Sequence, residues 1–591
     1  MVGKKQATAE DAVAPRARMH KLTIRNFRAI GQRPVEIELD DIVVLVGANN
    51  TGKSSILRAY QLVMESGKEG EMVLDDFPGA TIPDGGLPPE AVPTIELETV
   101  LYEDSKPPAE KWIDVKPNGE RHVRERWTWR APGRPEKRGF DVQKGDWDPD
   151  HGPWGVASVA QANRPAMHRI EAFDDPKRQA DSIIALLVEA TKQRVQALAA
   201  EGEKGPYTAL LNSLAELQKN VADEAMAAIE AVRMELGQAI ANVFPGYSIT
   251  LDARPEDDLE KAISFFKTPP VLRMGPQDGH QSDLERQGSG TRRTLMWNAL
   301  RIIADYKGAA TGGDRPHVLL LDEPELCLHP SAVRDACNVL YSLPRSNTWQ
   351  VMVTTHSPAF IDLSRNNTSI VRVERAKNGI VSGTTIFRPA RAQLSEDDKE
   401  RLKLLNMYDP YVAEFFFGGR TVIVEGDTEY TAFREVIAGL SERFRNVHVV
   451  RARGKYTIVA LCKILNQFNC PYAVLHDADT QKIEGKDGTK KANSAWSANK
   501  QILEEVGKAP AGTVRLAASL YTFEVAIFGE SVSGEKPFTA WLRVRKDAAA
   551  KQKVIALLDY LVGNSEDCPS GVLGWTEEPV LAAAVAQYEP A

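Results

Sequence analysis

A glycine-rich loop holds the residue types that a triphosphate requires. Its sequence, Gly-Ala-Asn-Asn-Thr-Gly-Lys-Ser over residues 47–54, fits the pattern Gly-x-x-x-x-Gly-Lys-Ser/Thr at every position. In such loops the backbone N–H groups surround the phosphates, so we expect Lys53 to contact the β- and γ-phosphates and the Ser54 hydroxyl to ligate Mg²⁺. The residues expected at the nucleotide are Gly47, Asn49, Asn50, Gly52, Lys53 and Ser54.

Two later apolar runs end in residues suited to phosphate chemistry. Leu319–Leu321 leads into Asp322 and Glu323. We expect Asp322 to hold the Mg²⁺, directly or through water, and Glu323 to orient or deprotonate the attacking water. The run over residues 351–355 leads into His356, which can donate a hydrogen bond to the γ-phosphate, although a histidine after a strand is more often structural.

A serine between two glycines precedes these runs. Ser289 lies in the segment Arg-Gln-Gly-Ser-Gly-Thr-Arg-Arg over residues 286–293, at the expected start of a helix. Backbone N–H groups at a helix start bind anions, so this serine is a second candidate phosphate contact.

A second group of acids follows two apolar runs further along the chain. Thr421–Val424 leads into Glu425, with Glu429 four residues later, and a run over residues 473–476 leads into Asp477 and Asp479. Because the carboxyl ends of parallel strands meet at one edge of an α/β sheet, we expect these four carboxylates to lie together. Oxygen ligands in this number suit Mg²⁺, Mn²⁺ or Ca²⁺, and without a cation they would repel one another.

The elements that position these residues read as two α/β units. The first alternates short strands with a helix after Lys53 and resumes with strands at residues 318–321 and 351–355. The second starts near Thr421 and alternates helices with strands at residues 421–424, 447–450, 472–475 and 513–516, the pattern of a parallel sheet.

Two long segments interrupt the first unit. Residues 106–165 are rich in Trp, Pro, Gly and Arg and predict a loop-rich or meander-like excursion. Residues 174–241 are rich in Ala, Leu, Glu, Gln and Lys at helical spacing and predict a helical insertion with a break near residues 202–206. This insertion is interpreted either as a packed hairpin or as a dimerisation arm.

Composition limits the class of protein. With 591 residues, the chain is too long for one core, and it has no apolar run long enough to cross a membrane. Its five cysteines form no Cys-x-x-Cys pair, which argues against disulfides and zinc and favours a reduced, cytoplasmic protein. The net charge of -8 means that any nucleic acid must be bound by local basic patches or through metal ions.

The order of the first motifs resembles the ABC-type ATPase domains of structural-maintenance and recombination-repair proteins. The motifs are the phosphate loop, the glycine-flanked serine, the strand ending in Asp322-Glu323 and the strand ending in Thr-His-Ser. In that family the serine of one domain faces the phosphate of a second. Ser289 therefore implies a homodimer or a higher even oligomer.

The second acid group resembles the Toprim domain, whose signature is Glu-Gly after one strand and Asp-x-Asp after a later one. An ABC-type ATPase followed by a Toprim domain is the architecture of the overcoming-lysogenization-defect (OLD) family, which includes the nuclease subunit of the Gabija phage-defence system. The resemblance implies an α/β chain with these parts: a disordered N-terminal extension (1–18), the first part of the ATPase domain (19–173), a helical insertion (174–242), the second part of the ATPase domain (243–390), a linker (391–420) and the Toprim domain (421–591).

The resemblance also assigns roles to residues of the Toprim part. Glu425, Glu429, Asp477 and Asp479 match its metal-binding acids, and Glu524 matches a later acid, although Thr522 stands where that motif often has a second acid. The family also implies a lysine that stabilises charge on the scissile phosphate. Our choice is Lys551, ahead of Lys553 and Lys536, with an ordinary surface lysine as the alternative.

The resulting expectation is an ATP-regulated DNA endonuclease in which two metal ions activate water for phosphodiester hydrolysis. One alternative is an ATP-driven DNA clamp whose Toprim domain binds without cutting. Another is a primase-like or RNA-cleaving Toprim enzyme. The resemblance further implies phage defence and a UvrD-like helicase partner.

Overall fold

The computed structural model describes the chain outside residues 1–17, 66–69, 102–106, 156–163, 172–174, 200–227, 253–269, 306–315, 347–348, 363–364, 366, 376–378, 389–391, 410–411, 418, 469–470, 485–489 and 588–591. The expected disordered extension and the helix break near residues 202–206 lie outside the described residues. The chain divides into two compact units: residues 1–45, 52–355 and 375–382 form the first, and residues 46–51, 356–374 and 383–591 form the second.

A parallel sheet carries the nucleotide motifs of the first unit. Its strands β3 (Ile42–Val46), β14 (Trp349–Thr354), β13 (His317–Asp322) and β9 (Ala166–Ile170) pair in that order. Every residue of β3 and β13 is buried, as continuous apolar runs predict for strands covered on both faces. The predicted strands at residues 42–46, 318–321 and 351–355 are therefore confirmed.

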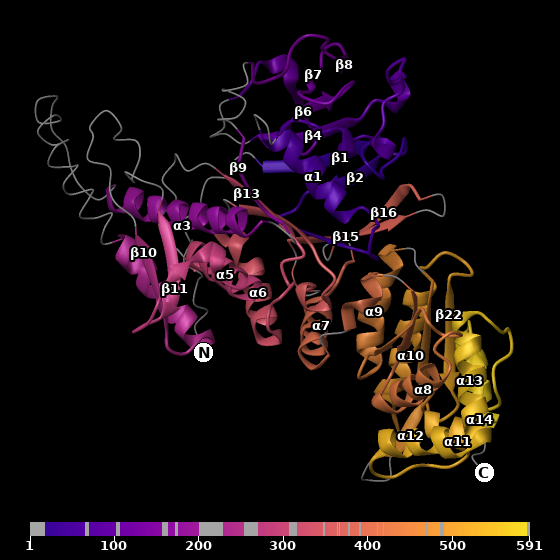
Figure 1. Ribbon diagram of the computed structural model, residues 1–591. Helices are drawn as coiled ribbons and strands as arrows, with labels where there is room; N and C mark the ends of the chain where they lie inside the picture. Colours follow the sequence, from indigo (N-terminus) through magenta and orange to yellow (C-terminus); the bar gives the residue numbers. More distant parts are fainter. Residues whose placement is uncertain are drawn as a thin grey trace, which may run out of the picture. The chain divides into compact units, whose positions relative to one another are not determined.

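An antiparallel sheet forms much of the segment that was predicted to be loop-rich. Its order is β2-β1-β4-β6-β7-β8, with β5 paired to β6 (Figure 1). The strands are β1 (Arg18–Arg25), β2 (Val35–Glu38), β4 (Thr94–Leu101), β5 (Ile113–Val115), β6 (Arg121–Thr128), β7 (Glu136–Asp141) and β8 (Asp146–Trp147). The meander half of the prediction is therefore confirmed for β6, β7 and β8.

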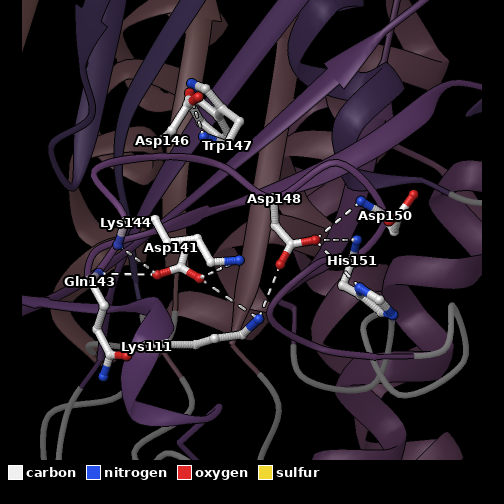
Figure 2. A network of polar contacts seen from close by, with 9 residues as sticks. All are labelled: Lys111, Asp141, Gln143, Lys144, Asp146, Trp147, Asp148, Asp150 and His151. Atoms are coloured by element: carbon white, nitrogen blue, oxygen red, sulfur yellow. Dashed lines mark hydrogen bonds and ion pairs between the residues drawn. The ribbon is translucent and has the colours of Figure 1, made fainter.

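Lys111 forms ion pairs with two acids at the end of this meander. Lys111 Nζ lies 3.0 Å from Asp148 Oδ2 and 3.9 Å from Asp141 Oδ2, between two buried carboxylates (Figure 2). The other oxygen of Asp148 accepts backbone N–H groups of Asp150 and His151, at 3.1 and 3.0 Å. These acids are thus neutralised and hydrogen-bonded within the fold, which gives the cluster a structural role.

Helices and a small sheet complete the first unit. They are α1 (Lys53–Met64), α3 (Pro176–Ala199), a helix over 228–243, α5 (Ser289–Asp305), α6 (Pro330–Ser342) and the three-stranded sheet β10 (Tyr247–Asp252), β11 (Val271–Pro276) and β12 (Ser282–Asp283). Helix α3 packs on α5, and Arg292 Nε donates to Gln179 Oε1 at 2.9 Å. The predicted helical insertion is thus helical where it is described.

The second unit contains a five-stranded sheet in the order β18-β17-β19-β22-β23. The strands β17 (Arg420–Val424), β18 (Val447–Arg451), β19 (Tyr472–Asp477) and β22 (Val514–Ser519) pair in parallel, and β23 (Val572–Gly574) is antiparallel. All four predicted strands are confirmed. The helices are α8 (Asp427–Gly439), α9 (Lys455–Phe468), α10 (Ser494–Val506), α11 (Phe523–Phe528), α12 (Lys536–Lys546), α13 (Ala548–Val562) and α14 (Glu578–Gln587).

The segment predicted as a linker contains helix α7 (Glu396–Tyr408), which packs on α9. Ser395 and Asp398 form a reciprocal capping box at its start, and Asp398 Oδ2 also lies 2.7 Å from Lys463 Nζ. The acids that suggested a linker are therefore the first turn of a helix. None of the helices in the described residues combines the length and apolar run that a membrane crossing needs.

Candidate functional site

The helix after the glycine-rich loop presents the predicted lysine and serine. Gly52 caps α1 with φ of 104°, and a Cβ there would lie 2.7 Å from Val381 Cγ2, so this position requires glycine. Lys53 is the first residue of α1 and only 5% exposed. Burial lowers the pKa of its ammonium, and the carboxylates of Glu323, Asp322 and Glu325 oppose that shift.

The earlier residues of the loop belong to the second unit. Gly47 has φ of 144° and approaches the Val373 carbonyl oxygen so closely that a side chain would collide with it. Asn50 takes the left-handed conformation with φ of 61°, which asparagine tolerates better than most residues. The Thr51 hydroxyl donates to the Ala48 carbonyl oxygen at 2.9 Å. In the same unit, the ring of His356 stacks on Phe417 at 6.4 Å between centroids.

The carboxylate of Asp322 joins three elements of the first unit. Its Oδ1 accepts hydrogen bonds from the Ser54 hydroxyl at 3.1 Å and from the Thr354 hydroxyl at 2.5 Å. Asp322 and Thr354 are register partners at the carboxyl ends of β13 and β14. The parallel sheet thus brings together the two residues predicted to hold Mg²⁺, and Thr354 fixes the orientation of the aspartate.

Glu323 has an unusual backbone conformation, with φ of 44°. Its N–H donates to Thr354 Oγ1 at 3.0 Å, and its carbonyl oxygen accepts from Arg293 Nη1 at 3.1 Å. A left-handed glutamate held by such contacts is typical of a functional position. Arg293 lies one turn after Ser289, which is exposed at the first position of α5, as predicted.

The second group of acids gathers at the carboxyl ends of strands β17 and β19. Glu425 directly follows β17, Glu429 lies in the first turn of α8, and Asp477 ends β19. The backbone N–H of Asp477 donates to Glu425 Oε2 at 3.1 Å, and Asp477 Oδ1 accepts from the N–H of Phe523 at 2.8 Å. Glu524, in the first turn of α11, accepts from the Thr428 hydroxyl at 3.4 Å.

Burial raises the pKa values of the central acids. Burial is the main cause for Glu429, whose pKa rises to about 7, and the charges of Glu425 and Glu524 add to it. The pKa of Asp477 rises well above its usual value, again mainly by burial, with Glu429 the next contributor. The pKa of Glu425 is raised by burial and partly restored by Lys455. These carboxylates are therefore close enough to repel one another, as predicted.

Two lysines contact the remaining acids. Lys455, only 3% exposed, forms an ion pair with Asp479 at the start of α9. Lys536, at the start of α12, lies 3.2 Å from Glu524 Oε1. Lys551 lies instead beside Gly439, where its Nζ would be 3.9 Å from an added Cβ. Gly439 ends α8 and Glu429 lies near its start, so the helix rise places Gly439 roughly 15 Å from Glu429 along the axis. Lys553 follows two residues later in α13.

The chemistry of these acids suits a hard divalent cation, but their arrangement suits it only in part. All supply oxygen ligands, and the raised pKa values of Glu425, Glu429 and Asp477 show unfavourable negative charge that a cation would relieve. Among the residues that the structure describes, no three His, Cys, Asp or Glu side chains are arranged to hold a metal ion. Metal binding therefore requires these carboxylates to rotate toward a shared position.

Comparison with protein families gives two matches along the chain. Residues 18–90 and 168–361 match the AAA ATPase domain, and residues 416–479 match the Toprim domain of overcoming-lysogenization-defect-like proteins. The chain thus carries an ATPase domain followed by a Toprim domain of the overcoming-lysogenization-defect-like (OLD-like) kind. The matched segments contain both groups of residues described above, apart from Glu524 and the lysines after residue 479.

Two curated proteins that are similar to this chain are named OLD nucleases. The Old nuclease of Escherichia phage P2 is 22% identical over 478 residues, which cover 78% of this chain and 77% of that protein. The OLD nuclease of Thermus scotoductus is 24% identical over 242 residues, which cover 40% of this chain and 45% of that protein.

Solved structures give a weaker likeness. The Smc head domain with a coiled coil and joint from Pyrococcus yayanosii matches 66% of this chain and 99% of its own, with a TM-score of 0.40 and 13% identity. The SMC head domain from Thermotoga maritima matches 63% and 98%, with a TM-score of 0.30 and 14% identity.

Two residues of these sites, Thr354 and Lys455, were not singled out from the sequence, and a third, Lys536, was ranked below Lys551. Thr354 was quoted only as part of a strand, although its register with Asp322 follows from two parallel strands of equal length. Lys455 follows β18 in the segment Arg-Ala-Arg-Gly-Lys over residues 451–455. The acids were selected because residues that follow parallel strands meet at one edge of the sheet, and the same reasoning would have selected this lysine. Lys536 was the third choice for the catalytic lysine and contacts Glu524.

Proposed function

We propose that this chain is an ATP-regulated, divalent-metal-dependent DNA endonuclease. The observation that carries the proposal is the gathering of Glu425, Glu429 and Asp477 at the carboxyl ends of adjacent parallel strands, with Glu429 buried and the other two partly buried. A bound divalent cation there would lower the pKa of a coordinated water and neutralise charge on a phosphodiester. The relatives named as nucleases support this reading of the acids.

The remaining residues have supporting roles in the proposal. Lys536 would balance charge on the phosphate next to Glu524, in place of Lys551. In the expected two-ion arrangement, Glu425, Glu429 and Asp477 would hold the first ion. Asp479 and Glu524 would hold the second ion, and for this they would have to give up their contacts with Lys455 and Lys536. Mg²⁺, Mn²⁺ and Ca²⁺ all suit such carboxylates.

ATP would act through the first site. Lys53 would bind the β- and γ-phosphates, Ser54 and Asp322 would hold the Mg²⁺, and Glu323 would position the water. The loop residues Gly47, Asn49, Asn50 and Gly52 would surround the phosphates, with His356 at the γ-phosphate. Ser289 would face the nucleotide of a second copy, which makes a homodimer or higher even oligomer part of the proposal. The helical segment over residues 174–242 is the proposed dimerisation element.

Plasmid cleavage tests the proposal. We expect purified protein to nick or linearise plasmid DNA with Mg²⁺ or Mn²⁺ and not with EDTA. The Glu425→Gln variant should lose this cutting, whereas the Glu442→Gln variant, altered at an exposed position after α8, should keep it. Cutting by the Glu425→Gln variant at the rate of the parent would overturn the proposal.

One observation favours a second candidate, the ATP-driven DNA clamp. The described acids are not arranged to hold a metal ion, and two of them are already paired with lysines. A clamp predicts ATPase activity and DNA binding without cleavage in any divalent ion. The same plasmid assay therefore separates the two candidates, and cleavage of RNA alone would favour the RNA-cleaving alternative.

The cellular role follows from the family. We propose phage defence in the cytoplasm, where the four described cysteines, all free thiols, would stay reduced. A UvrD-like helicase partner belongs to the same proposal. Co-purification with the product of a neighbouring gene, and loss of protection against phage infection in the Glu425→Gln variant, would test both.

A further inference from the structure

The β6–β7 hairpin, residues 121–141, is a basic region in an acidic chain. It contains seven Lys or Arg against two Glu and one Asp, a formal charge of +4 in a chain of net charge -8. Asp141 is buried beside Lys111, and Glu125 is buried and accepts from Arg164 Nη2 at 2.5 Å and Trp154 Nε1 at 3.1 Å. Their charges are balanced inside the fold, so the exposed charge of the hairpin is almost entirely positive.

Strand alternation separates the apolar and basic faces of this hairpin. On β6, Val123 and Trp127 point inward and are at most 1% exposed, while Arg124 and Arg126 take the opposite face. The Arg124 guanidinium lies 3.5 Å from the centroid of Phe140, and that of Arg126 lies 4.0 Å from the centroid of Trp147. Arg126 also donates to Glu96 Oε1 through Nε and Nη2, at 2.9 and 2.7 Å, so a phosphate would have to share or replace that glutamate.

The turn of the hairpin exposes three more arginines. The side chains of Arg134, Arg130 and Arg138 are 83%, 60% and 38% exposed. Their acid partners are exposed as well: Glu136 lies 3.5 Å from Arg130 and 3.4 Å from Arg138, and Glu71 lies 3.3 Å from Arg134. Exposed pairs of this kind contribute on the order of 0–1 kcal/mol, so a polyanion can replace the glutamates.

The turn is also held in place. The N–H of Gly133 donates to the Met72 carbonyl oxygen at 2.8 Å, and the N–H of Met72 donates back at 2.9 Å. A basic surface that is already ordered loses less conformational freedom on binding than a mobile loop would.

We propose that this hairpin binds the phosphate backbone of double-stranded DNA. The inference rests on the proposed action on DNA and names the surface that holds the duplex. Duplex is favoured over single strands because the hairpin's aromatic rings are not available for base stacking: Trp127 and Trp129 are buried, and arginines cover Phe140 and Trp147. Without groups that read base edges, binding should be independent of DNA sequence.

Salt dependence of DNA binding tests the surface. The probe is a labelled 40-base-pair duplex, and its Kd is measured by fluorescence anisotropy in EDTA, without ATP, at several salt concentrations. Each lost phosphate contact lowers the slope of log K against log salt by about 0.9. We expect the triple variant Arg130→Ser, Arg134→Ser, Arg138→Ser to lose about 2 to 3 in this slope and at least tenfold in affinity near 0.1 M salt.

Matched variants separate a surface effect from a change in net charge or folding. The triple variant Arg33→Ser, Arg334→Ser, Arg445→Ser removes the same charge from exposed positions elsewhere and should keep the slope. Replacing the three hairpin arginines by lysine should also keep it. ATPase activity without DNA should be equal in all of these proteins, which shows that the first unit is folded.

Two results would overturn the inference. One is an unchanged slope in the hairpin serine variant while the parent protein binds the duplex. The other is tighter binding of the parent to a single strand or an RNA duplex than to duplex DNA. Because binding is measured in EDTA, the outcome is independent of cleavage: loss of plasmid cutting would remove the proposed nuclease while leaving the hairpin as a DNA surface.

Discussion

The Ser54 hydroxyl donates a hydrogen bond of 3.1 Å to Asp322 Oδ1, although 268 residues separate the two in the chain. The same oxygen accepts from Thr354 at 2.5 Å. Both Mg²⁺ candidates of the nucleotide site are therefore in contact with each other, and a buried threonine sets the angle of the carboxylate. This contact depends on β3, β13 and β14 being parallel neighbours.

Substitutions of Lys53 and Glu323 should affect nucleotide binding and nucleotide hydrolysis differently. Lys53→Ala removes the charge at the phosphates and should abolish ATP binding, whereas Glu323→Gln should keep binding and slow hydrolysis at least ~100-fold. Binding of a fluorescent ATP analogue and phosphate release measure the two steps. ATP hydrolysis at the full rate in either variant would contradict the role assigned to that residue. Lys21→Ala, which removes a lysine from an exposed ion pair, serves as the charge control.

Thr354→Val should impair hydrolysis more than binding. The substitution keeps the side-chain shape but removes the donor to Asp322 and one acceptor for the Glu323 N–H. We expect hydrolysis to fall about tenfold and stability to fall by about 1–2 kcal/mol. Thr368→Val is the control, because the buried Thr368 hydroxyl has no hydrogen-bond partner among the described residues. Equal hydrolysis in the two variants would contradict the role of Thr354.

The pKa of Glu429 predicts a pH dependence for the second unit. Burial raises this pKa to about 7, against about 4.3 in an unfolded chain, so the folded state holds more protons between these pH values. Stability of the metal-free protein should therefore fall as pH rises from about 4 to 7. Since a cation must displace that proton, stabilisation by Mn²⁺ should be small at pH 5.5 and large at pH 8.

Thermal unfolding measures both effects, with EDTA and with Mn²⁺ at each pH. In Glu429→Gln the fall in stability with pH should shrink, while the exposed control Glu442→Gln should behave like the parent. An Mn²⁺ stabilisation that is equal at pH 5.5 and pH 8 in the parent would contradict this prediction.

Lys455 should compete with a divalent ion for Asp479. Its buried ammonium already neutralises that carboxylate, so Lys455→Met should tighten Mn²⁺ binding by about tenfold while lowering metal-free stability by about 1–3 kcal/mol. Calorimetric titration with Mn²⁺ gives the Kd. The control is Lys463→Met on the same helix, whose ion pair with Asp398 lies in another part of the unit. Unchanged Mn²⁺ affinity in Lys455→Met would show that the lysine does not occupy a metal position.

Lys536, rather than Lys551, should matter for cleavage. Lys536 contacts Glu524, whereas Lys551 lies at the far end of α8. Removing a cation that stabilises the reacting phosphate costs on the order of 100-fold, so Lys536→Met should cut plasmid about that much more slowly. Lys551→Met should remain within about twofold of the parent. The reverse order of the two rates would restore the lysine chosen from the sequence.

Local patterns predicted the parts of the fold that depend on continuous apolar runs. The strands before Gly47, Glu425 and Asp477 were found because each is buried on both faces. The antiparallel strands around Trp127 were predicted only as a meander-like excursion, because the inward face of β6 includes Glu125. Its charge is balanced by Arg164, which lies 39 residues away in the chain, so the expected apolar alternation is broken.

The sequence by itself determined the two groups of acids, the phosphate loop and the resemblance to the OLD family, because each motif is a short run whose chemistry follows from residue type and spacing. Only the tertiary structure decided which lysines reach the acids, that Thr354 holds Asp322, and that a basic hairpin pairs into the antiparallel sheet. Those contacts are set by strand order and helix direction. Lys536 therefore contacts Glu524 from the start of α12, whereas Lys551, which follows in α13, lies beside Gly439 at the end of α8.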